Sequence, residues 1–272
     1  MIGRGERTAN YVILIVFATI AVYPLLSVLA SALGAPDTGT PGPGVLGLHP
    51  ENFAAAWREG HFGTYLRASV IVSVTVVLVS VVLSILSGYA LGSMRFRGAD
   101  LLFYLFLLGM MMPNEVLVVS LYFDLRTLRL TDTLWAVILP QVAQSLAFGT
   151  YWMRAYFRSS SRALVKAARL DGAGPWRTLW SVLVPLARPA IVTLTLLVFM
   201  WTWNEFLIPL VMVTSENLRT APLGLAFFQG QYTQGFTLLA AGACIVATPV
   251  VALYVFGQRH FITGMLEGAV RE

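Results

Sequence analysis

Long apolar stretches without charge dominate this chain and are separated by short polar segments. Four stretches contain no Asp, Glu, Lys or Arg: Thr8–Pro36, Ala68–Met94, Thr133–Met153 and Thr220–Gln258. A helix that crosses a bilayer needs about 20 predominantly apolar residues. The pattern therefore predicts four membrane-spanning helices, over residues 11–33, 69–91, 133–153 and 236–257.

Two further apolar stretches each contain one acidic residue. Glu115 lies within residues 101–123, and Glu205 lies within residues 190–213. Both stretches are long and rich in Leu, Val, Phe and Met, which favours spans over buried amphipathic segments. None of the stretches has the alternation of a membrane barrel strand. The fold class predicted is all-α: a polytopic membrane protein with six transmembrane helices in a single domain over residues 1–272.

The composition supports this class. The chain is 57% hydrophobic and 11% charged, and its mean hydropathy is +0.75. Soluble domains are about 25% charged, so this composition excludes a soluble enzyme, a disordered chain and a secreted disulfide scaffold. The net charge of +5 is better explained by cationic loops at a membrane surface than by nucleic-acid binding.

The basic residues predict the orientation. If the N-terminus is cytoplasmic, 13 Lys and Arg residues lie in the inner segments and 5 lie in the outer segments. This asymmetry favours a multi-pass protein of a prokaryotic plasma membrane with both termini in the cytoplasm. The first apolar run is longer than the 7–15 residues of a signal peptide's apolar region, which favours a retained helix.

Small residues recur along the second predicted span. Ser80, Ser84, Gly88 and Gly92 follow one another every four residues and so share one helix face. Such a stripe lets another helix approach closely. We expect it to serve internal packing.

The inner loop at residues 154–189, between the fourth and fifth predicted spans, carries seven basic residues and one acid. Good helix formers fill residues 162–170, Gly172 can end that helix, and Pro175 suits the start of another. The second helix has apolar residues at i, i+3, i+4 and i+7: Trp176, Leu179, Trp180 and Leu183. The loop is therefore predicted to be a helix–turn–helix on the cytoplasmic face. From the residues alone, it could bind lipid or dock a cytoplasmic protein.

A longer motif in this loop resembles the EAA loop of ABC importer permeases. Lys166-Ala-Ala-Arg-Leu-Asp-Gly172 is followed by nine residues and then by Val182-Leu-Val-Pro185, which is the family spacing. Other segments are similar to the maltose-type carbohydrate uptake branch, in particular its smaller permease subunit. They are Met111-Met-Pro-Asn-Glu115, Trp203-Asn-Glu-Phe-Leu-Ile-Pro209 and the tail from Gln258 to Arg271. The resemblance covers nearly the whole chain and is weakest over residues 34–65.

The resemblance implies that the loop is a coupling element. In the family its first helix inserts into a cleft of the ATPase subunit. The residues that carry this role over to this chain are Lys166, Ala167, Ala168, Leu170, Asp171, Gly172 and Pro185. Lys166 stands where the family motif has Glu, a charge reversal, and Val182 and Val184 are milder departures. A compensating acid on the ATPase is our hypothesis for this reversal.

The chain carries no sign of its own nucleotide chemistry. A phosphate-binding loop requires a Gly-Lys-Ser/Thr sequence, and the single lysine, Lys166, is followed by Ala167. The three histidines are scattered, and no Ser-His-Asp set or metal-ligand spacing is evident. We therefore expect no enzyme activity, cofactor or metal site on this chain, and expect ATP and Mg²⁺ on a partner ATPase.

Polar residues inside the spans are candidates for a solute path. Buried polar groups are costly in a bilayer and face the bundle interior. The candidates for hydrogen bonding to a hydroxyl-rich solute are Asn114, Glu115, Gln141, Gln144, Asn204 and Glu205. The competing interpretation of the two Glu residues is structural: each caps a helix end or pairs with an Arg.

Together these features predict a permease subunit of an ABC importer that takes up a sugar or oligosaccharide by alternating access. The implied partners are a second permease, ABC ATPase subunits, an extracytoplasmic solute-binding protein and membrane lipid. Alternatives within the class are a polyol, a glycerophosphodiester or a peptide as cargo. Alternatives outside it are an ion-coupled secondary transporter and a membrane scaffold that does not transport.

Overall fold

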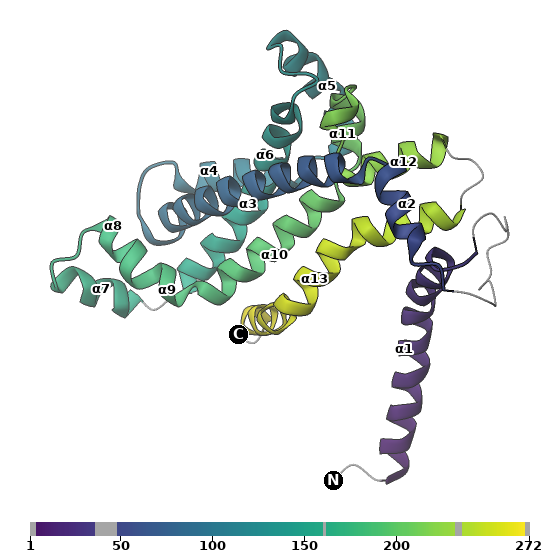
Figure 1. The fold of residues 1–272 in the computed structure, drawn as a ribbon. Coiled ribbons are helices and arrows are strands. Elements are labelled where there is room, and N and C mark those ends of the chain that lie inside the picture. Colours follow the sequence, from purple (N-terminus) through teal and green to yellow (C-terminus); the bar gives the residue numbers. More distant parts are fainter. Residues whose placement is uncertain (1–3, 36–47, 160–161, 232–235, 270–272) are drawn as a thin grey trace. The chain divides into compact units, whose positions relative to one another are not determined.

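The computed structural model describes residues 4–35, 48–159, 162–231 and 236–269 (Figure 1). Throughout these residues the regular secondary structure is helical, with no strand, so the all-α prediction is confirmed. The chain divides into two compact units, which are described separately. The first comprises residues 1–65 and 223–248, and the second comprises residues 66–222 and 249–272.

The first unit contains α1 (Arg4–Ala32), α2 (Glu51–Glu59), the beginning of α3 (Phe62–Ser93), most of α12 (Ala221–Gln231) and the first part of α13 (Phe236–Ala269). The buried Asn52 amide of α2 donates to the carbonyls of Ala32, at 3.0 Å, and Gly34, at 2.9 Å. These two bonds satisfy carbonyls that the end of α1 leaves free, and they fix α2 against it.

The second unit contains the remainder of α3 and α13, together with α4 (Ala99–Met111), α5 (Asn114–Thr127), α6 (Leu134–Ser159), α10 (Arg188–Asn204) and α11 (Leu207–Met212). Helix α6 contacts both α4 and α10. The stripe on α3 packs closely against α6. A Cβ atom added at Gly88 would lie 2.5 Å from the Met153 Cβ, and one at Gly92 would lie 3.0 Å from the Arg154 carbonyl oxygen. The predicted close approach of another helix to this stripe is confirmed.

The six predicted spans are not all continuous helices. Within the described residues, α1, α3 and α13 are long and apolar enough to cross a membrane. The number rises to five if two bent pairs each count as one span: Ala99–Met111 with Glu115–Thr127, and Pro175–Leu186 with Arg188–Asn204. Helix α6 is long enough at 26 residues but is not among the helices that meet both criteria, length and apolarity.

The third predicted span is broken at Pro113. Helix α4 ends at Met111, α5 begins at Asn114, and the two axes make an angle of 104°. Proline lacks the N–H of a continuing helix and pushes the preceding residue into an extended conformation. Met112 is extended, with φ −77° and ψ 129°. A single helix over residues 101–123 was therefore a wrong prediction.

The fifth predicted span is broken at Glu205. Helix α10 ends at Asn204, and the short α11 begins at Leu207. In a continuous helix the ring of Pro209 would clash with the carbonyl of the residue four positions earlier, which is Glu205. Glu205 instead adopts an extended conformation, with φ −64° and ψ 125°. A single helix over residues 190–213 was likewise a wrong prediction.

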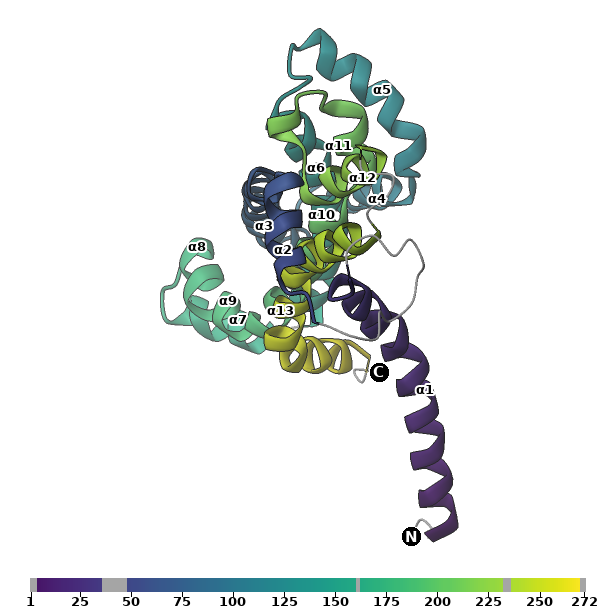
Figure 2. The same cartoon turned by 45° about the vertical axis from the view of Figure 1, so that its right-hand side comes forward.

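The inner loop folds into the predicted helix–turn–helix. Helix α7 (Arg162–Leu170) is followed by α8 (Pro175–Arg177), the π-helical turn η1 (Thr178–Leu183) and α9 (Val184–Leu186). Helix α7 packs back against η1, as both views of the ribbon show (Figures 1 and 2). We call residues 162–186 the hairpin.

Candidate functional site: a polar pocket and a helical hairpin

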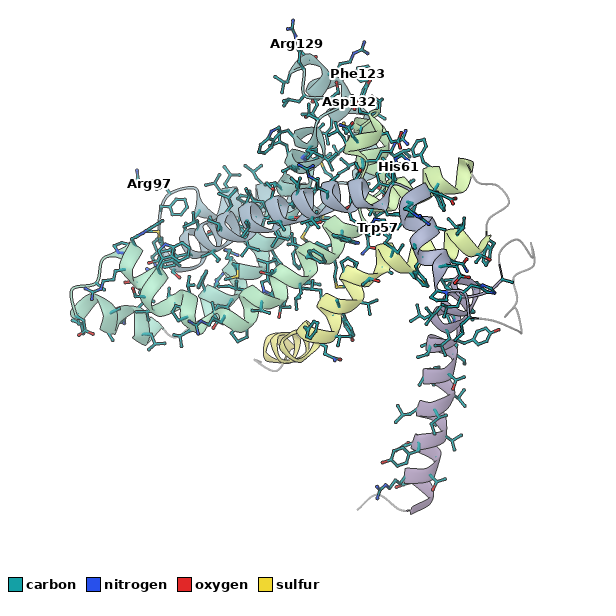
Figure 3. The ribbon with its side chains drawn as sticks, viewed as in Figure 1. Trp57, His61, Arg97, Phe123, Arg129 and Asp132 are labelled. Atoms are coloured by element: carbon teal, nitrogen blue, oxygen red, sulfur yellow. The ribbon has the colours of Figure 1, made fainter. Side chains whose placement is uncertain are left out.

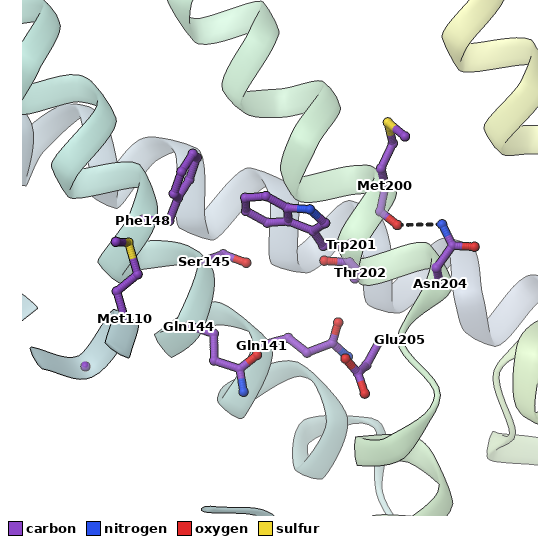
Figure 4. Close-up of a pocket in the computed structure, with 11 residues that line it drawn as sticks. Met110, Gln141, Gln144, Ser145, Phe148, Met200, Trp201, Thr202, Asn204 and Glu205 are labelled. Carbon is purple, nitrogen blue, oxygen red and sulfur yellow. Dashed lines mark hydrogen bonds between the residues drawn. The ribbon is translucent and has the colours of Figure 1, made fainter. Parts of the chain in front are cut away.

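A pocket of about 520 Å³ lies in the second unit where α4 and α10 end beside α6 (Figure 4). This volume is within the usual range for small-ligand sites, about 300–1,000 Å³. Its lining residues are Gly109, Met110, Gln141, Gln144, Ser145, Phe148, Met200, Trp201, Thr202, Asn204 and Glu205. Two helix ends thus bring polar groups into a region whose sequence is mostly apolar.

Three side-chain amides supply donors and acceptors to the pocket. The Asn204 amide nitrogen donates to the Met200 carbonyl at 2.8 Å, and the Gln141 amide nitrogen donates to the Val137 carbonyl at 3.2 Å. Each of these bonds uses the nitrogen of a side chain and fixes it against its own helix. Gln144 is half-buried in the same lining. The amides therefore offer a bound molecule both acceptor oxygens and donor groups.

Glu205 owes its position to the break between α10 and α11. One carboxylate oxygen accepts a hydrogen bond from the Ile208 backbone N–H at 3.0 Å, which satisfies a free donor at the beginning of α11. The same half-buried side chain lines the pocket. The structural interpretation and the pocket-lining interpretation of Glu205 are therefore both compatible with its geometry.

An aromatic surface completes the lining. The rings of Phe148 and Trp201 meet edge to face, with their centroids 4.9 Å apart. The Trp201 side chain is 47% exposed, so much of its indole remains open. In the close-up, these two rings lie on one side of the pocket, and Gln141, Gln144 and Glu205 lie on the other (Figure 4).

The structure brings together four of the six sequence-predicted path residues: Gln141, Gln144, Asn204 and Glu205. Glu115 is exposed in the first turn of α5 and does not belong to the lining, and the Asn114 side chain lies outside the described residues. Sequence reasoning missed Ser145 and Phe148. They follow Gln141 at i+4 and i+7, so a search along one face of this helix could have found them.

The turn of the hairpin is closed by backbone hydrogen bonds. Gly172 has φ +77°, the left-handed conformation that the sequence predicted for a helix-ending glycine. The Ala173 N–H donates to the Ala168 carbonyl at 2.8 Å, the long bond of a Schellman motif. Ala168 is buried beneath this turn, whereas Ala167 and Asp171 are exposed. The backbone conformation of this turn therefore depends on the positive φ angle of Gly172.

Two large apolar side chains of the hairpin are exposed. Leu170 is 89% exposed and Trp176 is 66% exposed, and Lys166 is exposed one turn before Leu170. Residues four apart lie on one helix face, so α7 presents Lys166 and Leu170 together. Pro185 lies in α9, where the hairpin leads into α10.

A third cluster joins the α5–α6 turn to the segment after α11. Asp132, at the turn labelled in Figure 3, accepts backbone hydrogen bonds from Thr214, at 3.0 Å, and Ser215, at 2.8 Å. Its second oxygen accepts the Ser215 hydroxyl. The Ser215 hydroxyl and then the backbone N–H groups favour the charged form, and together they lower the pKa of the Asp132 carboxyl below its ordinary value of 3.8.

Comparisons with known proteins assign the chain to a family. The family described as binding-protein-dependent transport system inner membrane component matches residues 80–265. The probable ABC transporter permease protein YurM of Bacillus subtilis is 34% identical, over 98% of this chain and 89% of that protein. The arabinooligosaccharides transport system permease protein AraQ of Halalkalibacterium halodurans is 33% identical, over 93% of this chain and 92% of that protein. The diacetylchitobiose uptake system permease protein NgcG of Streptomyces coelicolor is 30% identical, over 98% of this chain and 90% of that protein.

Solved structures support the fold. A chain in the crystal structure of a bacterial ABC transporter involved in alginate import aligns with a TM-score of 0.82 and 24% identity, over 96% of this chain and 99% of that one. A chain in the crystal structure of a bacterial alginate transporter in complex with an alginate pentasaccharide-bound periplasmic protein aligns with a TM-score of 0.68. Its sequence identity is 14%, over 92% of each chain. Since the family match covers most of the chain and the relatives match nearly all of it, this protein belongs to the inner-membrane components of binding-protein-dependent transport systems, as a multi-pass permease of the ABC importer type.

Proposed function

We propose that this chain is the permease subunit of an ABC importer for a saccharide, and that the pocket at the ends of α4 and α10 lies on the saccharide's path. The pocket's combination of amides, hydroxyls and open aromatic rings is the observation that carries this proposal. The names of related proteins point to the same cargo class, since they include transport systems for arabinooligosaccharides, diacetylchitobiose and trehalose.

Saccharide chemistry matches the lining. Each sugar hydroxyl both donates and accepts hydrogen bonds, and amide side chains can do the same. Gln141 and Asn204 keep their carbonyl oxygens for such contacts because the bonds to their own helices use the nitrogens. The C–H faces of a sugar ring can pack on the open indole of Trp201. A ligand with these two kinds of surface suits the pocket better than an inorganic ion does.

The helix breaks suit a transport path. Transporters place solute sites where membrane helices are discontinuous, because irregular backbone is tolerated only where it lines a cavity. Here α4 ends two residues after Gly109, and α10 ends at Asn204, so both breaks adjoin the lining. A second permease would face the open side of this pocket and enclose the path.

The hairpin is the proposed contact with the ATPase. Because this sequence has no phosphate-binding loop, ATP and Mg²⁺ are assigned to a separate subunit, whose nucleotide cycle supplies the driving force. The exposed Leu170 and Trp176 give the hairpin an apolar surface for a partner, and Lys166 adds a charge. This assignment places the hairpin and both termini in the cytoplasm and an extracytoplasmic solute-binding protein on the opposite face.

A series of linked and packed helices, bent by 78° between residues 175–186 and α10, can carry movement from the hairpin to the pocket. Helix α7 packs on η1, η1 continues into α9, and α9 leads into α10, which ends at the pocket-lining Asn204. The hydrogen-bonded turn at Gly172 keeps α7 fixed relative to α8. A displacement of α7 therefore passes as a rigid-body motion to the helix end that carries Asn204 and Glu205.

The test is saccharide uptake by the intact complex. The chain is purified in mild detergent with its bound subunits, which are identified by mass spectrometry, and is then reconstituted in vesicles with the solute-binding protein. We expect uptake of a labelled oligosaccharide that requires ATP and persists when ion gradients are dissipated. Uptake that needs an ion gradient and no ATP would indicate a secondary transporter. ATP-dependent uptake restricted to polyols, glycerophosphodiesters or peptides would overturn the proposed cargo.

A further inference from the structure

The lining of the pocket carries a net negative charge. Among its lining residues Glu205 is the one charged side chain, and the lining contains no Arg, Lys or His. In the part of the chain that the structure describes, the recorded ion pairs are His49–Glu51 and Arg154–Asp100, and neither involves Glu205. Among the described residues, therefore, no cation is paired with this carboxylate where it faces the pocket.

The role of Glu205 in the helix break leaves part of its carboxylate available. Its Oε1 atom accepts the Ile208 N–H, and no hydrogen bond to Oε2 is recorded among the described residues. The close-up shows the carboxylate on the same side of the pocket as the Gln141 and Gln144 side chains (Figure 4). A bound solute in this pocket would thus meet an anionic acceptor beside neutral amides.

We infer that Glu205 is a specificity-determining residue that makes this pocket favour neutral or cationic saccharides over anionic ones. The inference rests on the proposed saccharide path and adds the charge of the substrate to it. A solute carboxylate about 6 Å from Glu205 would be disfavoured about threefold at the dielectric constant of water, and about a hundredfold at the value of about 20 that suits protein surfaces. A neutral sugar hydroxyl would instead donate to the free carboxylate oxygen.

The test measures the electrostatic potential in the pocket without knowledge of the cargo. The single native cysteine, Cys244, is replaced by Ser, and Gln144→Cys places one thiol in the lining. The complex in vesicles is treated with a cationic trimethylammonioethyl or an anionic sulfonatoethyl methanethiosulfonate reagent. The ratio of the two rates is divided by the same ratio for 2-mercaptoethanol. This normalised ratio cancels any effect of Glu205 on thiol ionisation, because that effect changes both rates equally.

We expect a normalised preference of threefold or more for the cationic reagent, and a ratio near one after Glu205→Gln. Glu115→Gln removes the same charge outside the pocket and should leave the preference unchanged. Met110→Cys, on the α4 side of the lining, repeats the measurement if Gln144→Cys fails to fold.

The outcomes separate the two proposals. Thiols that react with both reagents at a ratio that Glu205→Gln does not change would leave the path intact and overturn the charge selection. Thiols at both positions that react with neither reagent would show that solutes do not enter the pocket, which overturns the proposed path as well. In competition assays, neutral oligosaccharides should inhibit uptake more strongly than uronic-acid oligosaccharides of equal length, and Glu205→Gln should narrow that difference.

Discussion

At the scale of residues, helices α6 and α10 supply the polar lining of the pocket, and Glu115 at the beginning of α5 lies outside that lining. Gln141 and Gln144 were predictable because both lie on one face of a helix that forms as expected. Glu115 was grouped with them on the assumption of a continuous third span. Pro113 turns the chain by 104° and separates Glu115 from the pocket lining. Helical periodicity holds within a helix and does not extend across such a break.

Asp132 offers a residue-scale prediction of pH dependence. Its folded pKa is lowered, so its stabilising contribution is present above the unfolded value of about 3.8 and is lost as the pH falls through the lower folded value. Asp132→Asn should reduce the free energy of unfolding at pH 7 by about 1 kcal/mol, because a half-exposed charged acceptor is lost. Asn tolerates the left-handed backbone at this position, where φ is +58°.

Thermal unfolding of the detergent-solubilised complex at pH 7 and at pH 3 checks this prediction. The unfolding temperatures of wild type and Asp132→Asn should differ at pH 7, and this difference should become smaller at the acidic pH. Asp124→Asn, at an exposed position on the neighbouring α5, is the matched control and should have no effect at either pH. Equal unfolding temperatures for wild type and Asp132→Asn at pH 7 would refute the stabilising role of this cluster.

At the scale of helices, length and apolarity predicted where membrane segments lie but not where they break. The existence of both broken spans was predictable, because residues 101–123 and 190–213 are long and apolar. The breaks depend on single prolines and on the neighbouring residues that accept an extended conformation. Pro140 lies inside α6 without ending it, whereas Pro113 separates α4 from α5. Proline alone therefore does not decide whether a membrane helix ends, since neighbouring packing can compensate.

The close approach of α3 and α6 gives a prediction for the helix pair. A methyl group at Gly88 would lie 2.5 Å from the Met153 Cβ and 2.9 Å from the Arg154 backbone nitrogen, atoms that no side-chain rotation can move away. Gly88→Ala should therefore force the helices apart and lower the free energy of unfolding by about 1–3 kcal/mol, the usual cost of overpacking. The measurement is the unfolding temperature of the purified complex.

Gly63→Ala provides the control on the same helix. The nearest atom to a Cβ at Gly63 is a Trp57 ring carbon at 3.4 Å, an ordinary van der Waals distance. Since alanine is the better helix former, this variant should be neutral or slightly stabilising. If Gly88→Ala behaved like Gly63→Ala, the close packing of the stripe would be refuted.

At the scale of the whole molecule, the charge of Lys166 on the hairpin should affect how ATP hydrolysis is coupled to saccharide uptake. Lys166 and Leu170 are exposed on the same face of α7, and the family motif has Glu where this chain has Lys166. If an acidic residue of the ATPase compensates for this reversal, Lys166→Glu places two like charges at the interface. Such a juxtaposition costs several kcal/mol, so a loss of coupling of about tenfold or more is expected.

Uptake and ATP hydrolysis measured on the same vesicles check this prediction, because their ratio separates coupling from the amount of active complex. Lys166→Glu should lower the saccharide transported per ATP hydrolysed, and Lys166→Gln should have a smaller effect because it removes a charge without reversing it. Arg126→Glu makes the same reversal on an exposed residue in the last turn of α5, away from the hairpin, and should leave the ratio unchanged. An unchanged ratio in Lys166→Glu would mean that the hairpin docks through its apolar side chains, such as Leu170, and that the reversed charge has no partner on the ATPase.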